Sequence, residues 1–293
     1  MNFKEDIRIF LVGIAMGVAN IIPGVSGGTI AVVFGIYENL MEALGNFISD
    51  KEKRWQYVYF LAVLFAGSLI AVVGLAGLLS WCFENYPLMT VYFFMGLILG
   101  SIPVVIKSHH DMKINVSRFM ALMIGIIVVV WLALLQSGSA ADGSKIMDFH
   151  NYSALDFGYF LVCGIIAASA MIIPGVSGSF ILILLGAYWT VLGALSGLFN
   201  LLFQNGFSNE VISRLLILGF LGVGVVVGIL GFSRIMSWAL KKFPAVTMYA
   251  ILGLIIGSFY QIYPGFEISL NGLAAIGTLT AGLLISLKFA KYD

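Results

Sequence analysis

The sequence predicts an all-α polytopic membrane protein made of two inverted-topology repeats, each a re-entrant helical hairpin followed by three transmembrane helices. Of its 293 residues, 61% are hydrophobic and 10% are charged, whereas soluble domains carry about 25% charged residues. Apolar runs long enough to cross a bilayer recur along the chain. A signature rich in Pro and Gly interrupts the apolar sequence twice, once in each half. These observations together predict the fold class.

The duplicated signature reads Ile-Pro-Gly-Val-Ser-Gly-Gly-Thr at residues 22–29 and Ile-Pro-Gly-Val-Ser-Gly-Ser-Phe at residues 173–180, 151 positions later. Pro and Gly break a helix, whereas Ser, Gly and Thr suit the start of the next one. We therefore expect a helix, a break and a second helix that begins near Ser26 or Ser177. The expected hairpin breaks are Pro23, Gly24, Pro174 and Gly175.

The apolar segment that precedes the first break is only about 13 residues long, too short to span a bilayer. It therefore suits a hairpin that enters and leaves the membrane on one side, with its break satisfied by protein or water. The same order of segments follows in both halves, separated by a polar linker at 137–156. The first repeat (1–136) has a hairpin at 7–48 and spans at 57–83, 88–106 and 119–135; the second (157–293) has a hairpin at 157–203 and spans at 215–233, 245–263 and 271–287.

Matches within the spans support the duplication, at an offset of 157. Pro87 corresponds to Pro244, and Gly100-Ser101 corresponds to Gly257-Ser258. Because three spans is an odd number, the second repeat is expected upside down relative to the first. Inverted repeats are typical of transporters that alternate access to a midplane site.

The distribution of basic residues predicts the orientation. With these spans, thirteen Lys and Arg side chains fall on the side of the N-terminus, and only Lys145 and Arg214 fall on the other. The positive-inside rule then places both termini in the cytoplasm and the linker outside it.

The two breaks are the candidate binding site. A helix N-terminus offers unpaired N–H groups and the positive end of a dipole, and glycine lets an anion approach the backbone. Two other readings stay open: small residues allow close helix packing, or the helix ends near Asn20 and Met171 hold a cation through carbonyl oxygens. The expected phosphate- or carboxylate-binding residues are Ser26, Gly27, Gly28, Thr29, Ser177, Gly178 and Ser179.

Two ionisable residues are candidates for coupling or gating. Glu38 is either a proton-coupling residue or an interfacial carboxylate, and its counterpart in the second repeat is Trp189. Arg214 opens the first span of the second repeat, where it either guides a phosphate or anchors the helix end.

Other chemistry has little support in the sequence. No nucleophile–base pair, metal cluster or nucleotide motif stands out, so we expect neither an enzyme nor a metal nor a cofactor, with proton or sodium coupling left open. His109 and His110 read as loop residues, and Cys82 and Cys163 as packing residues. No basic face with interleaved aromatics indicates nucleic acid, the first ten residues do not read as a cleaved signal peptide, and the sequence does not predict an oligomeric state.

The two signatures, with Gly-Ile-Tyr-Glu at 35–38 and Gly-Ala-Tyr at 186–188, resemble those of the PopT polyprenyl-phosphate translocase family. Trp189 stands where the family pattern leads us to expect an acidic residue. The resemblance covers essentially the whole chain. It implies a bacterial or archaeal cytoplasmic-membrane protein that returns undecaprenyl phosphate from the outer to the cytoplasmic leaflet for cell-wall polymer synthesis. From the residues alone, a transporter or channel for a small soluble anion remains an alternative, as does a membrane enzyme or scaffold acting on lipid phosphates.

Overall fold

The computed structural model describes residues 3–21, 26–107, 113–139, 153–205, 208–266 and 268–290. Within these ranges the regular structure is helical and contains no strand, which confirms the predicted all-α class. Several residues named above lie outside the described ranges: Pro23, Gly24, His109, His110, Lys145 and most of the linker at 137–156.

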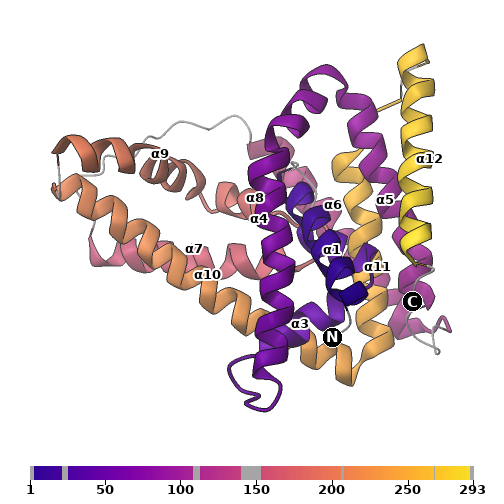
Figure 1. The fold of residues 1–293 in the computed structure, drawn as a ribbon, viewed down its shortest axis with the longest axis horizontal. Coiled ribbons are helices and arrows are strands. Elements are labelled where there is room, and N and C mark those ends of the chain that lie inside the picture. The colour runs from indigo at the N-terminus through magenta and orange to yellow at the C-terminus, as the bar shows by residue number, and fades with distance from the viewer. Residues whose placement is uncertain are drawn as a thin grey trace. The chain divides into compact units, whose positions relative to one another are not determined.

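Twelve helices make up the described parts of the chain (Figure 1). They are α1 (Phe3–Ile21), α2 (Gly27–Val33), α3 (Tyr37–Asn46), α4 (Arg54–Asn85), α5 (Pro87–Lys107), α6 (Val116–Ser139), α7 (Ala154–Ile172), α8 (Gly178–Leu184), α9 (Tyr188–Asn205), α10 (Asn209–Lys242), α11 (Pro244–Ile262) and α12 (Leu270–Ala290).

Six of these helices are long and apolar enough to cross a membrane: α4, α6, α7, α10, α11 and α12. Five of them coincide with predicted spans. The sixth, α7, was expected only as a short hairpin arm, but its apolar stretch runs from Leu155 to Ile172 and meets the length of a span. The predicted span at 88–106 forms α5, whose apolar part, Pro87–Pro103, is shorter than the others.

The returning arm of each hairpin is two helices, where the sequence led us to expect one. Gly35 adopts a left-handed φ of 70°; its N–H donates to Val32 O (3.0 Å), and the N–H of Ile36 donates to Ala31 O (2.9 Å). This pair of hydrogen bonds is a Schellman motif, which ends α2 and favours glycine. Gly186 ends α8 in the same way, with a φ of 74°, and α9 then departs at an angle of 114°.

Contacts divide the chain into two compact units. Unit 1 comprises Met1–Trp131, Ile173–Val176 and Ser233–Asp293, and unit 2 comprises Leu132–Ile172 and Ser177–Phe232. Unit 1 therefore contains spans from both halves of the sequence.

Equivalent glycines bring the first arm of each hairpin against the following long helix. In unit 1, a Cβ placed on Gly13 of α1 would lie 2.1 Å from the carbonyl oxygen of Leu64 on α4. In unit 2, a Cβ on Gly164 of α7 would lie 2.3 Å from that of Leu221 on α10. Both distances are far below van der Waals contact, so the two backbones touch in each pair (α1 beside α4 in Figure 1).

Two further helix pairs of unit 1 join one half of the sequence to the other. A Cβ on Gly96 of α5 would lie 2.0 Å from Leu279 O of α12. The positions 157 residues away are Gly253 of α11 and Leu122 of α6, and there the distance would be 2.1 Å. The third span of one half therefore packs on the second span of the other half, which explains why unit 1 mixes the halves.

Candidate functional site

The first break is braced by side chains of the chain itself. Ser26 caps α2: its Oγ accepts a hydrogen bond from the Gly28 N–H (3.1 Å), as expected for a helix that begins at this serine. Asn20, at the end of α1, accepts a hydrogen bond from the Gly27 N–H through Oδ1 (3.0 Å). Ser26 and Thr29 are 4% and 1% exposed. An anion that binds the N–H groups of Gly27 and Gly28 must therefore displace the oxygens of Asn20 and Ser26.

The second break is more open. α8 begins at Gly178, as expected, but the side chain of Ser177 makes no capping hydrogen bond. Instead, the hydroxyl groups of Ser177 and Ser179 lie 2.8 Å apart, and Ser179 is exposed. Met171 occupies the position equivalent to Asn20 and offers no amide oxygen. The second break thus presents two neighbouring hydroxyl groups at an accessible surface.

Residues of the two signatures meet in unit 1. The N–H of Gly175 donates a buried hydrogen bond of 2.8 Å to Thr29 Oγ1, across 146 residues of sequence. Gly175 has a left-handed φ of 82°, and a Cβ there would lie 2.9 Å from Leu254 O on α11. No local pattern in the sequence pairs these two residues, although both lie in the signatures from which the breaks were predicted.

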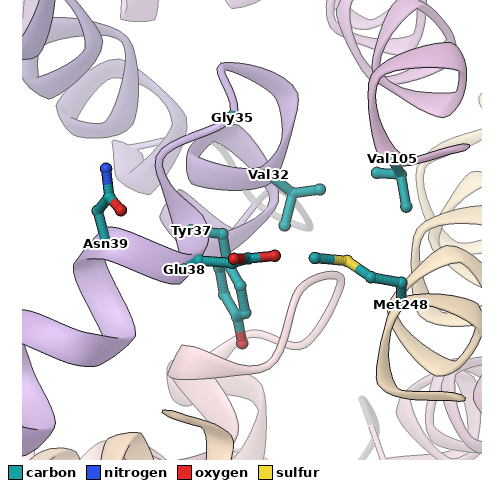
Figure 2. Close-up of a pocket in the computed structure, with 7 residues that line it drawn as sticks. All are labelled: Val32, Gly35, Tyr37, Glu38, Asn39, Val105 and Met248. Carbon is teal, nitrogen blue, oxygen red and sulfur yellow. The ribbon is translucent and has the colours of Figure 1, made fainter. Parts of the chain in front are cut away.

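Glu38 lines a pocket of about 220 Å³ in unit 1. Figure 2 shows its carboxylate directed toward the side chain of Met248, while Asn39 points away. Val105 and Met248 are buried, whereas Glu38 is exposed, so the carboxylate lies between solvent-accessible surface and two apolar side chains. The lining residues are Val32, Gly35, Tyr37, Glu38, Asn39, Val105 and Met248.

Arg214 is 8% exposed and engaged within unit 2. Its Nη2 pairs with Glu210 Oε1 at 2.7 Å, and its Nη1 donates to the carbonyl oxygen of Gly193 on α9. The guanidinium thereby ties α9 to α10. Of the two roles left open by the sequence, this geometry favours the anchor.

The structure offers no metal centre among the residues it describes, because no three His, Cys, Asp or Glu side chains are grouped suitably there. Cys82 and Cys163 are free thiols, and Cys163 is buried in an apolar cluster with Phe160 and Ile217.

Comparison with known proteins identifies the family. The profile of the undecaprenyl phosphate translocase-like family matches residues 16–278. The chain belongs to this family. A polyprenyl-phosphate transporter of Vibrio cholerae is 35% identical over 280 residues, covering 91% of this chain and 80% of that protein. A polyprenyl-phosphate transporter of Staphylococcus aureus is 30% identical over 283 residues, covering 96% and 95% respectively.

The resemblance inferred from the two signatures is thus confirmed. Both relatives of this translocase-like family are named as transporters and neither as an enzyme, which agrees with the non-enzymatic interpretation of the sequence. No solved structure matches the chain.

Proposed function

We propose that the protein transports polyprenyl phosphate, specifically undecaprenyl phosphate, from the outer to the cytoplasmic leaflet of a bacterial membrane for reuse of the lipid carrier. The observation that carries the proposal is the family match across residues 16–278, supported by two polyprenyl-phosphate transporters at 35% and 30% identity. The helices long and apolar enough to span a membrane provide the setting that such a substrate needs.

The proposed mechanism is alternating access by two inverted repeats. The equivalent contacts of α1 with α4 and α7 with α10 support it, since each repeat contains the same closely packed pair. The contacts α5–α12 and α6–α11, each between one half and the other, are also made by residues that correspond at the offset of 157. The proposed orientation has both termini in the cytoplasm, on the strength of the uneven distribution of Lys and Arg.

The phosphate is proposed to bind at the two Pro-Gly-Val-Ser-Gly breaks. Phosphate carries charge into a region of low dielectric, where fixed N–H and O–H donors offset the cost of leaving water. At the second break the hydroxyls of Ser177 and Ser179 are accessible as donors. At the first break, phosphate would take the place of Asn20 Oδ1 and Ser26 Oγ on the N–H groups of Gly27 and Gly28, and the released Ser26 hydroxyl would then donate to the phosphate.

Glu38 is the proposed proton-coupling residue, because its carboxylate borders the pocket against α5 and α11. A carboxylate costs less to remove from water when it is protonated. Binding of a proton to Glu38 would therefore favour a transport state in which this side chain is dehydrated. Arg214 is proposed to hold α9 on α10 during transport and not to bind phosphate, since Glu210 and Gly193 already engage it.

The proposal is tested with purified protein in liposomes that carry a polyprenyl phosphate in one leaflet. Arrival of the head group in the other leaflet is followed, with uptake of inorganic phosphate measured in parallel. Transfer is expected for the wild-type protein and is expected to be lost in Ser26→Ala/Ser177→Ala and in bulky replacements of Gly27 or Gly178. Ser49→Ala is the matched control, because Ser49 is exposed and bonds only within its own turn to Asn46 O.

Uptake of inorganic phosphate without head-group transfer would replace the lipid substrate by a small soluble anion. Full transfer by the folded double serine variant would remove the breaks as the phosphate site while leaving the substrate intact.

A further inference from the structure

A second pocket of unit 1, of about 270 Å³, is formed by α1, α2, α5 and α12. The residues that line it are all apolar, in contrast to the pocket at Glu38. Its lining includes Leu11, Ala15, Ile30, Phe34, Phe93 and Phe94. We call this pocket the α1–α5 groove.

The groove starts where the first signature ends. Ile30 follows Thr29 directly on α2, so the groove begins at the end of the signature, and Phe34 lies about 8 Å further along the helix axis. On its other walls, Leu11 is 45% exposed and Ile285 is 40% exposed. In a membrane, side chains exposed in this way face lipid, so the groove is open to the bilayer.

We propose that the α1–α5 groove binds the isoprene units nearest the phosphate of the transported lipid. This inference rests on the proposed function. A cavity of about 150 Å³ holds a six-carbon benzene ring, so a groove of 270 Å³ accommodates about two five-carbon isoprene units. The rings of Phe93 and Phe94 meet edge to face (5.5 Å, 86°) and offer a rigid, broad apolar surface to methyl-branched carbons.

The repeated fold does not require the two phenylalanine rings of this groove. At the equivalent positions of the second repeat, Ala250 and Ile251 replace Phe93 and Phe94. Ser169 replaces Val18, another residue of the groove, and its hydroxyl donates to Ile165 O at 2.7 Å. Elsewhere the lining is apolar in both repeats, with Ile181, Leu185 and Leu254 at the positions equivalent to Ile30, Phe34 and Leu97. The paired rings of Phe93 and Phe94 therefore distinguish the first repeat, and they are the feature that we assign to the ligand.

The test fills the groove without touching the breaks. Ala15→Trp places a large ring into the groove, whereas Ile166→Trp introduces the same ring at the equivalent, lipid-exposed position of α7. Leaflet transfer of farnesyl phosphate and of straight-chain pentadecyl phosphate is measured in phosphatidylcholine–phosphatidylglycerol liposomes.

The wild-type protein and Ile166→Trp are expected to transfer farnesyl phosphate about tenfold faster than the straight chain, and Ala15→Trp is expected to abolish this preference. A tenfold change in transfer rate corresponds to the loss of roughly two buried methylene groups from the groove. Equal transfer of the two lipids by the wild-type protein, or a preference retained in Ala15→Trp, would overturn the groove assignment alone. Absence of transfer of either lipid by the wild-type protein would count against the proposed function itself.

Photolabelling keeps the inference testable if Ala15→Trp does not fold. Wild-type protein is irradiated with farnesyl phosphate that carries a diazirine on the isoprene unit next to the phosphate, and the labelled peptides are identified by mass spectrometry. Labels on α1 and α5 around Leu11 and Phe94 are expected, and displacing them should take about ten times more pentadecyl phosphate than unlabelled farnesyl phosphate. Labelling confined to other helices, or displacement by the two lipids at equal concentrations, would show that the groove holds ordinary lipid.

Discussion

The two breaks share the sequence Pro-Gly-Val-Ser-Gly but have different polar partners. At the first, Asn20 and Ser26 accept hydrogen bonds from the opening N–H groups of α2, and the first turn is buried. At the second, Met171 replaces Asn20, and the hydroxyls of Ser177 and Ser179 bond each other at an accessible surface. The shared residues therefore determine where the helices break, and the neighbouring residues determine which donors are accessible.

The difference is confined to polar groups, because the backbone framework is alike in both repeats. Gly35 and Gly186 end α2 and α8 with the same hydrogen bonds. Gly13 and Gly164 bring equivalent helices into backbone contact.

The largest expected effect is at the contact that joins the signatures. Gly175→Ala puts a side chain on a residue with a φ of 82° and brings its Cβ within 2.9 Å of Leu254 O. We expect a loss of about 3 kcal/mol in the free energy of unfolding, from left-handed strain and the backbone clash together. Thermal unfolding in detergent measures it.

Gly265→Ala is the control, because Gly265 has a φ of 89° but no atom within 4 Å of the added Cβ. Strain alone should cost it about 1–2 kcal/mol. Equal losses in the two variants would show that the packing of Gly175 against α11 adds nothing.

The second largest effect is expected at the side-chain contacts that join the returning arm of each hairpin to the next long helix. Arg214→Met removes a mostly buried charge from Glu210 and from Gly193 O, and we expect a loss of about 2 kcal/mol because Glu210 remains 23% exposed. The equivalent residue in the first repeat is Tyr57, whose hydroxyl interacts with Glu42. Tyr57→Phe should cost about 1 kcal/mol or less, since Tyr57 is more exposed.

Both are measured by thermal unfolding and by leaflet transfer. A loss of transport in a fully stable Arg214→Met would restore the phosphate-guiding role that the observed contacts disfavour.

The sequence was sufficient for five of the six helices that could span a membrane and for the starts of α2 and α8, because long apolar runs and the signature are local features. It was insufficient for the second break in each hairpin. Gly35 and Gly186 precede aromatic residues in both copies, but a glycine in an apolar run indicates close packing as readily as a helix end.

Long-range contacts could not be predicted from the sequence for a different reason. Gly175 and Thr29 are 146 residues apart, and no local pattern pairs them. The Glu210–Arg214 pair, in contrast, has the i, i+4 spacing of helical ion pairs and was available as a signal. The role of the breaks in phosphate binding stays a prediction.

A smaller effect is expected from removing the hydroxyl that receives the Gly175 N–H. Thr29→Val keeps the shape of the side chain but leaves a buried donor without its acceptor, which should cost about 1–2 kcal/mol. Thr29→Ser keeps the acceptor and should cost less. Phe180, the equivalent residue in the second repeat, has no acceptor, so the reciprocal bond cannot form there.

If this bond favours one of two transport states, Thr29→Val should also change the ratio of inward to outward transfer in liposomes. An unchanged ratio, together with the expected loss of stability, would make the bond purely structural.

The smallest effect tests the brace that distinguishes the first break from the second. Asn20→Met gives the first break the residue of the second and removes the acceptor of the Gly27 N–H. We expect a loss of about 1 kcal/mol in thermal unfolding, since Asn20 is itself exposed and water can replace it. Transfer of polyprenyl phosphate should persist, because the N–H that Asn20 covers becomes available to the phosphate. Loss of transfer at normal stability would instead mean that the Asn20 amide itself contacts the phosphate at the first break.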